Sequence, residues 1–195
     1  RVDSTAGAPR LLVNGKPVRA RMFWGAQGAS PLPIGPQAQQ VTFEFVAKQD
    51  EPAKATMHLR FGPVTGDVYL DDIRVVDLDT QQDVLPTCTF EEGAESWRRR
   101  WTFWPPGPEN TVGQIAVAPG AGRDGSAALR VSLKAPAGGH WPDFHLYSHQ
   151  NLALRKGHRY RVSLWARAEP ERKLVIAFYR PGQPFVFLGG PPSPF

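Results

Sequence analysis

The chain has 195 residues, of which 41% are hydrophobic and 21% are charged, with 19 Gly and 20 Pro. That density of Gly and Pro excludes a helical bundle or a coiled coil, because either residue costs about 1 to 3 kcal/mol in a helix interior. An aromatic content of 11% provides apolar surface to bury, which excludes an intrinsically disordered protein. Length and composition together indicate one all-β domain or two small domains.

Charge and cysteine content limit the partners further. The formal net charge is +5, but the basic residues are scattered, so we expect a solvated basic surface and no nucleic-acid partner. Cys88 is the single cysteine, which excludes an intrachain disulfide and a cysteine-based metal cluster. No apolar run approaches the roughly 20 residues that a membrane span needs, so we expect no membrane insertion.

Residues 1–40 are expected to form an N-terminal arm and a crossover. The stretch Asn14-Gly15-Lys16-Pro17 is typical of a tight turn, and it separates two short apolar runs at 11–13 and 18–24. Three prolines follow within residues 30–36. The arm is therefore predicted to be a hairpin followed by irregular chain.

From Val41 onward the sequence alternates between apolar and polar residues, which is the pattern of half-buried strands. Residues 41–47 and 57–61 show it most clearly, and residues 68–78 continue as one long strand before a loop at 80–86. Further strands are predicted at 87–90, 97–104, 114–117, 127–133, 143–147, 160–168, 173–179 and 185–188. Roughly ten to twelve short strands predict an all-β protein, an antiparallel β-sandwich or jelly roll over residues 41–188 with a linker-like tail at 189–195.

No catalytic motif stands out in the sequence. The chain lacks the G-x-S-x-G motif of serine hydrolases, a P-loop, and the H-E-x-x-H motif of zinc proteases. Carboxylates brought together from separate strands, such as Glu44, Glu91 or Asp143, remain open as the machinery of a small glycan-active enzyme. The chain by itself is predicted not to be an enzyme.

Trp165 is the main candidate for ligand contact. In the strand predicted at 160–168, the apolar residues alternate with Trp165 and its polar neighbours, so Trp165 is expected to face solvent. The same alternation puts Glu44, His58, Arg60 and Arg130 on solvent faces. A face that combines a ring with charged groups suits sugar recognition, because the ring stacks on C–H groups and the charges bond hydroxyls. The alternative is that a loop or the arm covers Trp165.

Further aromatic residues lie in or beside loops rich in Pro and Gly, where binding residues are often displayed. These candidates for ligand contact are Trp97, Trp101, Trp104, Trp141 and Tyr147. The alternative for each tryptophan is that it anchors its loop to the core. As a set, we expect at least one of them to touch a ligand.

Four stretches resemble the jelly-roll, galactose-binding-like carbohydrate-binding modules found beside xylanases and glucanases. Residues 89–93 (Thr-Phe-Glu-Glu-Gly) followed by Trp97 are similar to the opening strand of these modules, and residues 122–131 are similar to their second strand. Residues 157–167 resemble their G-x-x-Y-x-x-S-x-W-x-K/R strand, and residues 68–73 resemble their closing strand. The resemblance covers roughly residues 41–180 and implies a β-sandwich that binds carbohydrate.

The order of these stretches departs from the order in the family, because the closing strand precedes the opening strand here. Either the module is circularly permuted, or the chain holds the end of one module and the start of another. Residues 41–80 and 87–188 add up to about one module, and an unpaired half sheet would leave exposed edges. We therefore expect one permuted module, which is feasible where the termini of a sandwich lie close together.

The resemblance also implies a structural Ca²⁺ ion. Carried over to this sequence, its ligands would be Glu91, Asp72 and the region of Asp124, with backbone carbonyls completing the shell. Oxygen donors from three segments are what Ca²⁺ prefers. The alternative is that Asp71 and Asp72 simply end a strand beside turns.

The segment 9–18 around Asn14-Gly15-Lys16-Pro17 is similar to the lead-in of large secreted glycoside hydrolases. We therefore expect an extracellular, non-catalytic accessory module that binds a polysaccharide or an oligosaccharide, in a polypeptide that also carries a catalytic domain. This expectation rests on analogy and says nothing direct about chemistry. The alternatives are a structural domain that docks onto the catalytic domain and, less favoured, the small glycan-active enzyme.

Overall fold

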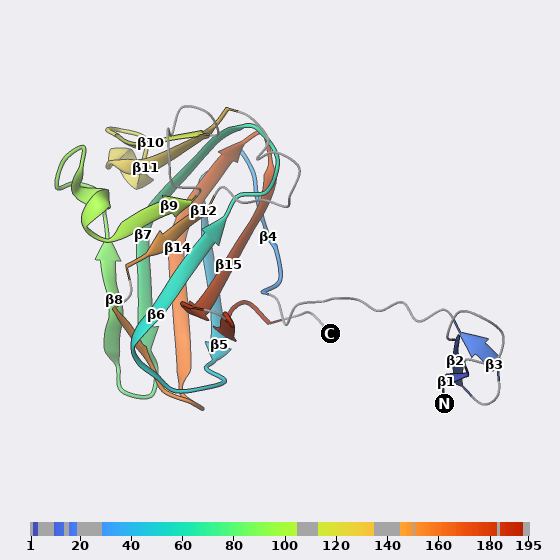
Figure 1. Cartoon of the computed structure of the whole chain (residues 1–195). Coiled ribbons are helices and arrows are strands. Elements are labelled where there is room, and N and C mark those ends of the chain that lie inside the picture. The colour runs from blue at the N-terminus through green and yellow to red at the C-terminus, as the bar shows by residue number, and fades with distance from the viewer. Residues whose placement is uncertain are drawn as a thin grey trace.

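The computed structural model describes residues 2–3, 10–13, 16–18, 29–104, 113–134, 145–149, 151–182 and 184–192. Within them, two antiparallel sheets of six and seven strands lie face to face (Figure 1). The prediction of an all-β antiparallel sandwich is confirmed. In the described ranges, no helix has the length and apolar character needed to cross a membrane.

The six-stranded sheet has the order β10-β11-β7-β14-β5, and β8 joins it by pairing with β7. Its strands are β5 (Gln39–Val46), β7 (Gly66–Asp77), β8 (Gln82–Cys88), β10 (Gly113–Ala118), β11 (Ala128–Leu133) and β14 (Arg159–Glu169). The long strand β7 serves two partners along one edge, since its first half pairs with β11 and its second half with β8.

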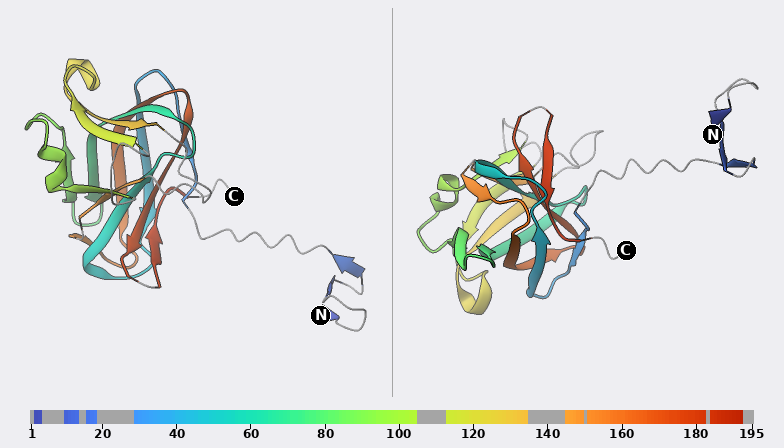
Figure 2. Two further views of the ribbon diagram at one scale, coloured as in Figure 1. Left: turned by 45° about the horizontal axis from the view of Figure 1, so that its top comes forward. Right: turned by 90° about the horizontal axis from the view of Figure 1, so that it is seen from below.

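The seven-stranded sheet has the order β16-β15-β6-β12-β9, with β13 paired to β6 and β4 paired to β15. Its strands are β4 (Leu32–Ile34), β6 (Glu51–Arg60), β9 (Trp101–Trp104), β12 (His145–Ser148), β13 (Leu152–Leu154), β15 (Arg172–Arg180) and β16 (Val186–Gly189). Seen from below, the two sheets form the two layers of the sandwich (Figure 2).

The two segments that carry the family resemblance fold into one body. Strand β7 from the first segment lies between β11 and β14 from the second segment, and β6 lies between β15 and β12 in the same way. Each sheet therefore needs both segments to be complete. This interleaving favours one module over the pieces of two modules.

Apolar residues at alternate strand positions fill the space between the sheets. Phe45 of β5 stacks on Tyr160 of β14 at 5.4 Å between ring centroids and on Phe178 of β15 at 4.7 Å, so it joins both sheets. Phe45 is 6% exposed, and Tyr160 and Phe178 are fully buried. Alternation of this kind follows from the strand itself, in which successive side chains point to opposite faces.

Three local predictions are wrong. The loop expected at 80–86 is mostly strand, because the edge of β7 offers Gln82–Cys88 a pairing partner that its polar sequence does not reveal. The first half of the strand expected at 97–104 is a 3₁₀ helix over Ser96–Arg99. The crossover also contains β4, which pairs with β15.

The N-terminal arm contains a small sheet of its own. Strands β1 (Val2–Asp3), β2 (Arg10–Val13) and β3 (Lys16–Val18) pair antiparallel in that order. The hairpin predicted around residues 14–17 is confirmed by the pairing of β2 with β3. At the other end of the chain, residue Gly189 belongs to β16, and Gly190 and Pro191 are buried, so the first residues of the expected tail lie in the sandwich.

Candidate functional site

The outward surface of the seven-stranded sheet carries the most continuous group of rings in the described residues. Residues directly opposite each other in antiparallel strands share a face. One cross-strand row therefore consists of Trp104, His145, Arg60 and Val175, and the next consists of Thr102, Tyr147, His58 and Ala177. A third row brings Thr56 beside Tyr179 and Phe187. We call this surface the aromatic face.

The rings of the aromatic face contact one another across four strands. His58 of β6 lies 5.1 Å from His145 and 5.5 Å from Tyr147 of β12, both stacked, and 5.0 Å from Tyr179 of β15, edge-on. Tyr179 in turn meets Phe187 of β16 at 5.8 Å. These centroid distances lie in the range of favourable aromatic pairs. The contacts join the side chains into one platform with His58 at its centre.

His58 is held neutral by its surroundings. Burial lowers the pKa of its imidazole to about 3, and the nearby His145 and Arg60 act in the same direction. Its Nε2 lies 2.9 Å from Oγ1 of Thr56, whose hydroxyl also lies within hydrogen-bond distance, 3.3 Å, of the carbonyl oxygen of Tyr179. The other nitrogen, Nδ1, is buried without a hydrogen-bond partner among the described residues. A buried polar atom without a partner is uncommon and calls for an explanation.

The rim of the aromatic face is more open than its centre. Trp104 of β9 is 43% exposed, and Tyr147, Tyr179 and Phe187 are partly exposed. Lys48 lies over the ring of Phe187, 5.1 Å from its centroid. The platform therefore presents accessible ring edges and faces at its border.

Trp165, the main candidate from the sequence, lies on the other sheet. Its strand alternates as predicted, with Tyr160, Val162, Leu164 and Ala166 buried and Trp165 partly exposed on the outer side. The guanidinium of Arg123 lies 5.5 Å from the centroid of the Trp165 ring. This outer surface of the six-stranded sheet, which we call the polar face, also carries Glu44 and Arg130.

The charged side chains of the polar face bind one another. Arg161 donates to one carboxylate oxygen of Glu44 at 2.7 and 3.0 Å, and Arg130 donates to Asp67 at 2.7 and 3.1 Å. Arg167 lies 3.8 Å from the centroid of the Tyr69 ring. The structure thus divides the predicted binding residues between two opposite surfaces, with Trp104, Tyr147 and Arg60 on the aromatic face and Trp165, Glu44 and Arg130 on the polar face.

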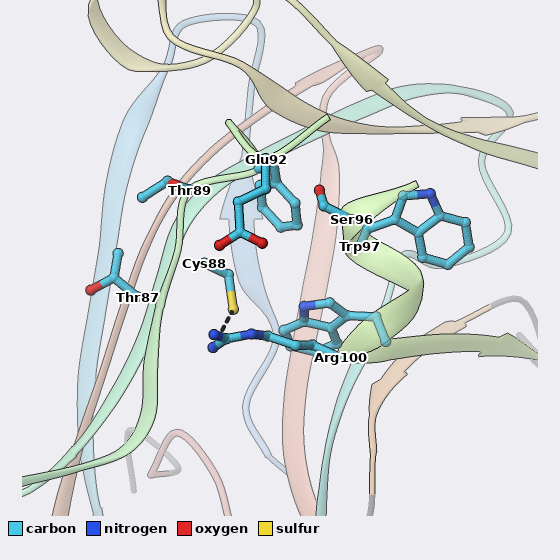
Figure 3. A pocket seen from close by; sticks show the side chains of 9 residues that line it. Thr87, Cys88, Thr89, Glu92, Ser96, Trp97 and Arg100 are labelled. Atoms are coloured by element: carbon cyan, nitrogen blue, oxygen red, sulfur yellow. Dashed lines mark hydrogen bonds between the residues drawn. The ribbon is translucent and has the colours of Figure 1, made fainter. Parts of the chain in front are cut away.

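Trp97 and Trp101 are buried, at 2% and 1% exposure. They line a small pocket beside Cys88, whose sulfur lies 3.9 Å from Nη1 of Arg100 (Figure 3). Burial raises the pKa of the Cys88 thiol, although the charge of Arg100 and the indole of Trp101 act in the opposite direction. Both indoles belong to the core, as the loop-anchoring alternative has it, and the binding surface proposed below does not include them. The fourth loop candidate, Trp141, lies outside the described residues.

The three residues expected to bind Ca²⁺ lie at one rim of the sandwich. Burial raises the pKa of Asp72, and the carboxylates of Asp71, Asp124 and Glu91 add to this effect, while Arg123 opposes it. Nε of Arg123 lies 3.7 Å from Asp72 and 3.3 Å from Asp124. In the described residues, however, the ligand atoms of Glu91, Asp72 and Asp124 do not come within 4.8 Å of one another. Carboxylates from three segments are the ligand type that Ca²⁺ takes, but a shared site needs them to move closer together.

Hydrogen bonds to backbone and side-chain donors hold this rim together. The backbone N–H of Ala127 donates to Glu91 at 2.6 Å. Asp71 accepts from the N–H of Arg123 at 3.0 Å and from the hydroxyl of Ser126 at 2.8 Å. The loop before β11 is thereby tied to β7 and to the segment after β8. The acidic residues therefore hold the segments of this rim together through hydrogen bonds.

A second acidic group was not predicted from the sequence. In the part of the chain that the structure describes, Asp77, Asp79 and His158 place ligand atoms within 4.8 Å of one another. Their polar atoms already bond within the hairpins: Nδ1 of His158 lies 2.9 Å from Asp77, which also accepts from the N–H groups of Asp79 and Thr80. Asp79 accepts from the N–H of Arg159. These hydrogen bonds give the three residues a structural role, because they connect the turn after β7 to the start of β14.

The sequence analysis missed three rings of the aromatic face, namely His145, Tyr179 and Phe187. The signal for Tyr179 was present, because the alternation in Lys173–Tyr179 that buries Leu174, Ile176 and Phe178 turns Tyr179 outward. What the sequence lacks is the strand order that puts Tyr179 beside His58. Comparison of the chain with protein-family models, with curated proteins and with solved structures finds no match.

Proposed function

We propose that the protein is a non-catalytic carbohydrate-binding module that holds a polysaccharide or an oligosaccharide on its aromatic face. The observation that carries this proposal is the unbroken chain of ring contacts from His145 through His58 to Tyr179 and Phe187, bordered by the exposed Trp104. A platform of rings on a rigid sheet suits a sugar chain, because sugar rings present C–H groups to aromatic faces.

Polar groups lie among the rings where sugar hydroxyls would meet them. Tyr147, Thr102 and Arg60 occupy outward positions in the same two cross-strand rows, next to His58. Bound sugars would combine stacking with a small number of hydrogen bonds, and their hydroxyls must give up water to do so. Binding in the micromolar to millimolar range is therefore expected, since area alone does not produce high affinity.

Two of the three carboxylates considered for an enzyme already have partners in the structure. Glu44 pairs with Arg161 on the polar face, and Glu91 accepts the N–H of Ala127 at the acidic rim. Asp143 lies outside the described residues. These contacts favour a binding role for the described part of the chain over acid and base catalysis of glycan cleavage.

Two further expectations from the family resemblance belong to this proposal. The first is a structural Ca²⁺ ion held at the rim by Glu91, Asp72 and Asp124, where it would neutralise crowded carboxylates. The second is a place beside a catalytic domain of the same polypeptide, outside the cell, where polysaccharides are the substrates. Interleaving of β6 and β7 with strands of the second segment supports the permuted module that the resemblance implies.

Affinity electrophoresis of the purified chain against a panel of polysaccharides tests the proposal. We expect retardation by at least one glycan, and we expect Tyr147→Ala or Tyr179→Ala to weaken it about thirtyfold, because truncating an important ring of a binding surface typically costs about 2 kcal/mol. Trp165→Ala is the matched control, since it removes a partly exposed ring from the polar face and should leave retardation unchanged.

Three outcomes would contradict the proposal. Migration unchanged by every glycan would favour the alternative in which the aromatic residues contact a neighbouring domain. Loss of retardation with Trp165→Ala but not with Tyr147→Ala would move the binding surface to the polar face. Release of reducing sugars by the purified chain, abolished by a single Glu→Gln change, would establish an enzyme instead.

A further inference from the structure

The two sheets differ in charge as well as in aromatic content. The seven strands of the sheet that bears the aromatic face contain one acidic residue, Glu51, which is buried and accepts a hydrogen bond from Arg180 at 2.7 Å. The basic residues of the same strands are Lys54, Arg60, Arg172, Lys173 and Arg180. The outward surface of this sheet is therefore biased toward positive charge.

Arg60 is the member of this basic set that stands inside the aromatic face. Its backbone pairs with His145 on one side and with Val175 on the other, so its side chain rises between a ring and a small apolar residue. It is half-buried, and no acidic residue in the described ranges forms an ion pair with it. The charge of Arg60 acts on His58, whose imidazole stays neutral.

Other arginines that are buried or half-buried in the sandwich have partners. Arg180 pairs with Glu51, Arg172 donates to the carbonyls of Val64 and Thr65, and Arg167 lies over the ring of Tyr69. A partly buried guanidinium is costly unless it is paired or hydrogen-bonded. Arg60 therefore stands out as a half-buried cation without an acidic partner among the described residues.

We propose that the ligand of the aromatic face is an acidic glycan, and that Arg60 pairs with a carboxylate of its uronic acid residues. This inference rests on the proposed function and adds the class of sugar. The planar guanidinium can donate two parallel hydrogen bonds to one carboxylate, and Arg60 stands in the same cross-strand row as the ring of His145, which stacks on His58. The overall charge of +5 would attract such a polymer over longer distances.

The sharpest test compares one polymer in two forms. Polygalacturonate and its carboxyl-reduced form share a backbone and differ in charge, so titration calorimetry of the purified chain at 150 mM NaCl isolates the contribution of the carboxylate. We expect the acidic form to bind at least tenfold more tightly. Arg60→Gln should remove that difference and leave affinity for the reduced form unchanged. Arg161→Gln, on the polar face, is the matched control and should retain it.

Each result separates this inference from the proposed function. Equal affinity for the two forms, with binding still lost in Tyr147→Ala, would overturn the acidic ligand and keep the carbohydrate-binding role. Absence of binding to either form and to every neutral glycan of the panel would overturn both. Equal losses with Arg60→Gln and Arg161→Gln, or equal binding of a single-stranded oligonucleotide, would show attraction by general charge and overturn the role given to Arg60.

Discussion

The two outer surfaces of this sandwich are built on the same alternation of side chains and yet satisfy their polar groups in different ways. On the polar face, guanidinium and carboxylate groups bind each other, as in the pairs Arg161–Glu44 and Arg130–Asp67. On the aromatic face, rings contact rings, while among the described residues Nδ1 of His58 has no hydrogen-bond partner and Arg60 has no acidic partner. The polar face therefore satisfies its own charges, whereas the aromatic face leaves two polar groups without such partners in the described residues.

If both faces belong to one folded body, removing a side chain that joins the two sheets should destabilise both. Phe45 is such a side chain. Its ring joins the two sheets through Tyr160 and Phe178. We expect Phe45→Ala to lower the free energy of unfolding by about 3 to 5 kcal/mol, the usual cost of removing a buried ring. Chemical denaturation measures the loss, and Val46→Ala, at a residue that is 52% exposed, is the control with an expected change within about 0.5 kcal/mol.

Hydrogen exchange shows whether this loss is shared. Backbone amides of β6 and β14 belong to different sheets, so in a single cooperative body both should lose protection together in Phe45→Ala. Protection lost in β14 but retained in β6 would show two independent units. That result would end the comparison of two faces of one module.

A Ca²⁺ ion held by Glu91, Asp72 and Asp124 would stabilise the rim beside the polar face. It should not change ligand binding on the aromatic face. If the ion binds the folded state selectively, Ca²⁺ at 100 times its dissociation constant would raise the free energy of unfolding by about 2.7 kcal/mol. Asp72→Asn should reduce this gain and Asp79→Asn should not, which distinguishes the predicted rim from the group of Asp77, Asp79 and His158. Thermal melts with Ca²⁺ and with a chelator give the measurement, and identical melting temperatures would exclude the ion.

Individual residues show which features of the fold and of the candidate site can be predicted from the sequence. The alternation around Trp165 correctly predicted which side chains are buried, because the period of a strand is a local property. Arg60 was also correctly expected to face outward. Which outward residues share a surface depends on the order of the strands, and that order is fixed by pairings between distant segments, such as His58 with Tyr147. The sequence alone therefore merged two surfaces into one predicted site.

The buried tryptophans show a second limit of local patterns. Trp97 lies in a stretch where aromatic and basic residues crowd together, and no period distinguishes a displayed ring from an anchoring ring. The turn of 3₁₀ helix at Ser96–Arg99 directs Trp97 into the interior. The guanidinium carbon of Arg98 lies over the Trp97 ring, 4.4 Å from its centroid. Only the packing of this helix against the sandwich decides the role of the ring.

The pH dependence of stability should differ between the two faces. His58 has a folded pKa of about 3, below its ordinary value of 6.5, so the unfolded chain takes up a proton there as the pH falls below 6.5. Its contribution to stability is present above pH 6.5 and is lost toward pH 3, by up to about 1.4 kcal/mol for each pH unit. On the polar face, burial acts to raise the pKa of Asp67, but bonds from Ser132 and Arg130 lower it, so its contribution is lost below pH 3.8.

Urea denaturation between pH 7 and pH 5 isolates the part due to the aromatic face. We expect the wild-type protein to lose stability over this range and His58→Gln to lose less, because Gln does not titrate. Asp67→Asn should behave as the wild type over the same range, since Asp67 acts only in stronger acid. Equal slopes for the wild type and His58→Gln would mean that His58 is not held neutral by the fold.

The smallest effect is expected where the polar face is most visibly held together. Glu44 and Arg161 form an ion pair whose side chains are 42% and 51% exposed. Exposed pairs contribute about 0 to 1 kcal/mol, because water screens the charges and ordering two long side chains costs entropy. A double-mutant cycle with Glu44→Gln and Arg161→Gln should therefore give a coupling below about 1 kcal/mol that fades in 1 M NaCl. A larger, salt-independent coupling would mean that the polar face is shielded from water. Trp165 would then be expected to lie in an interface on that face, covered by another part of the protein or by a partner.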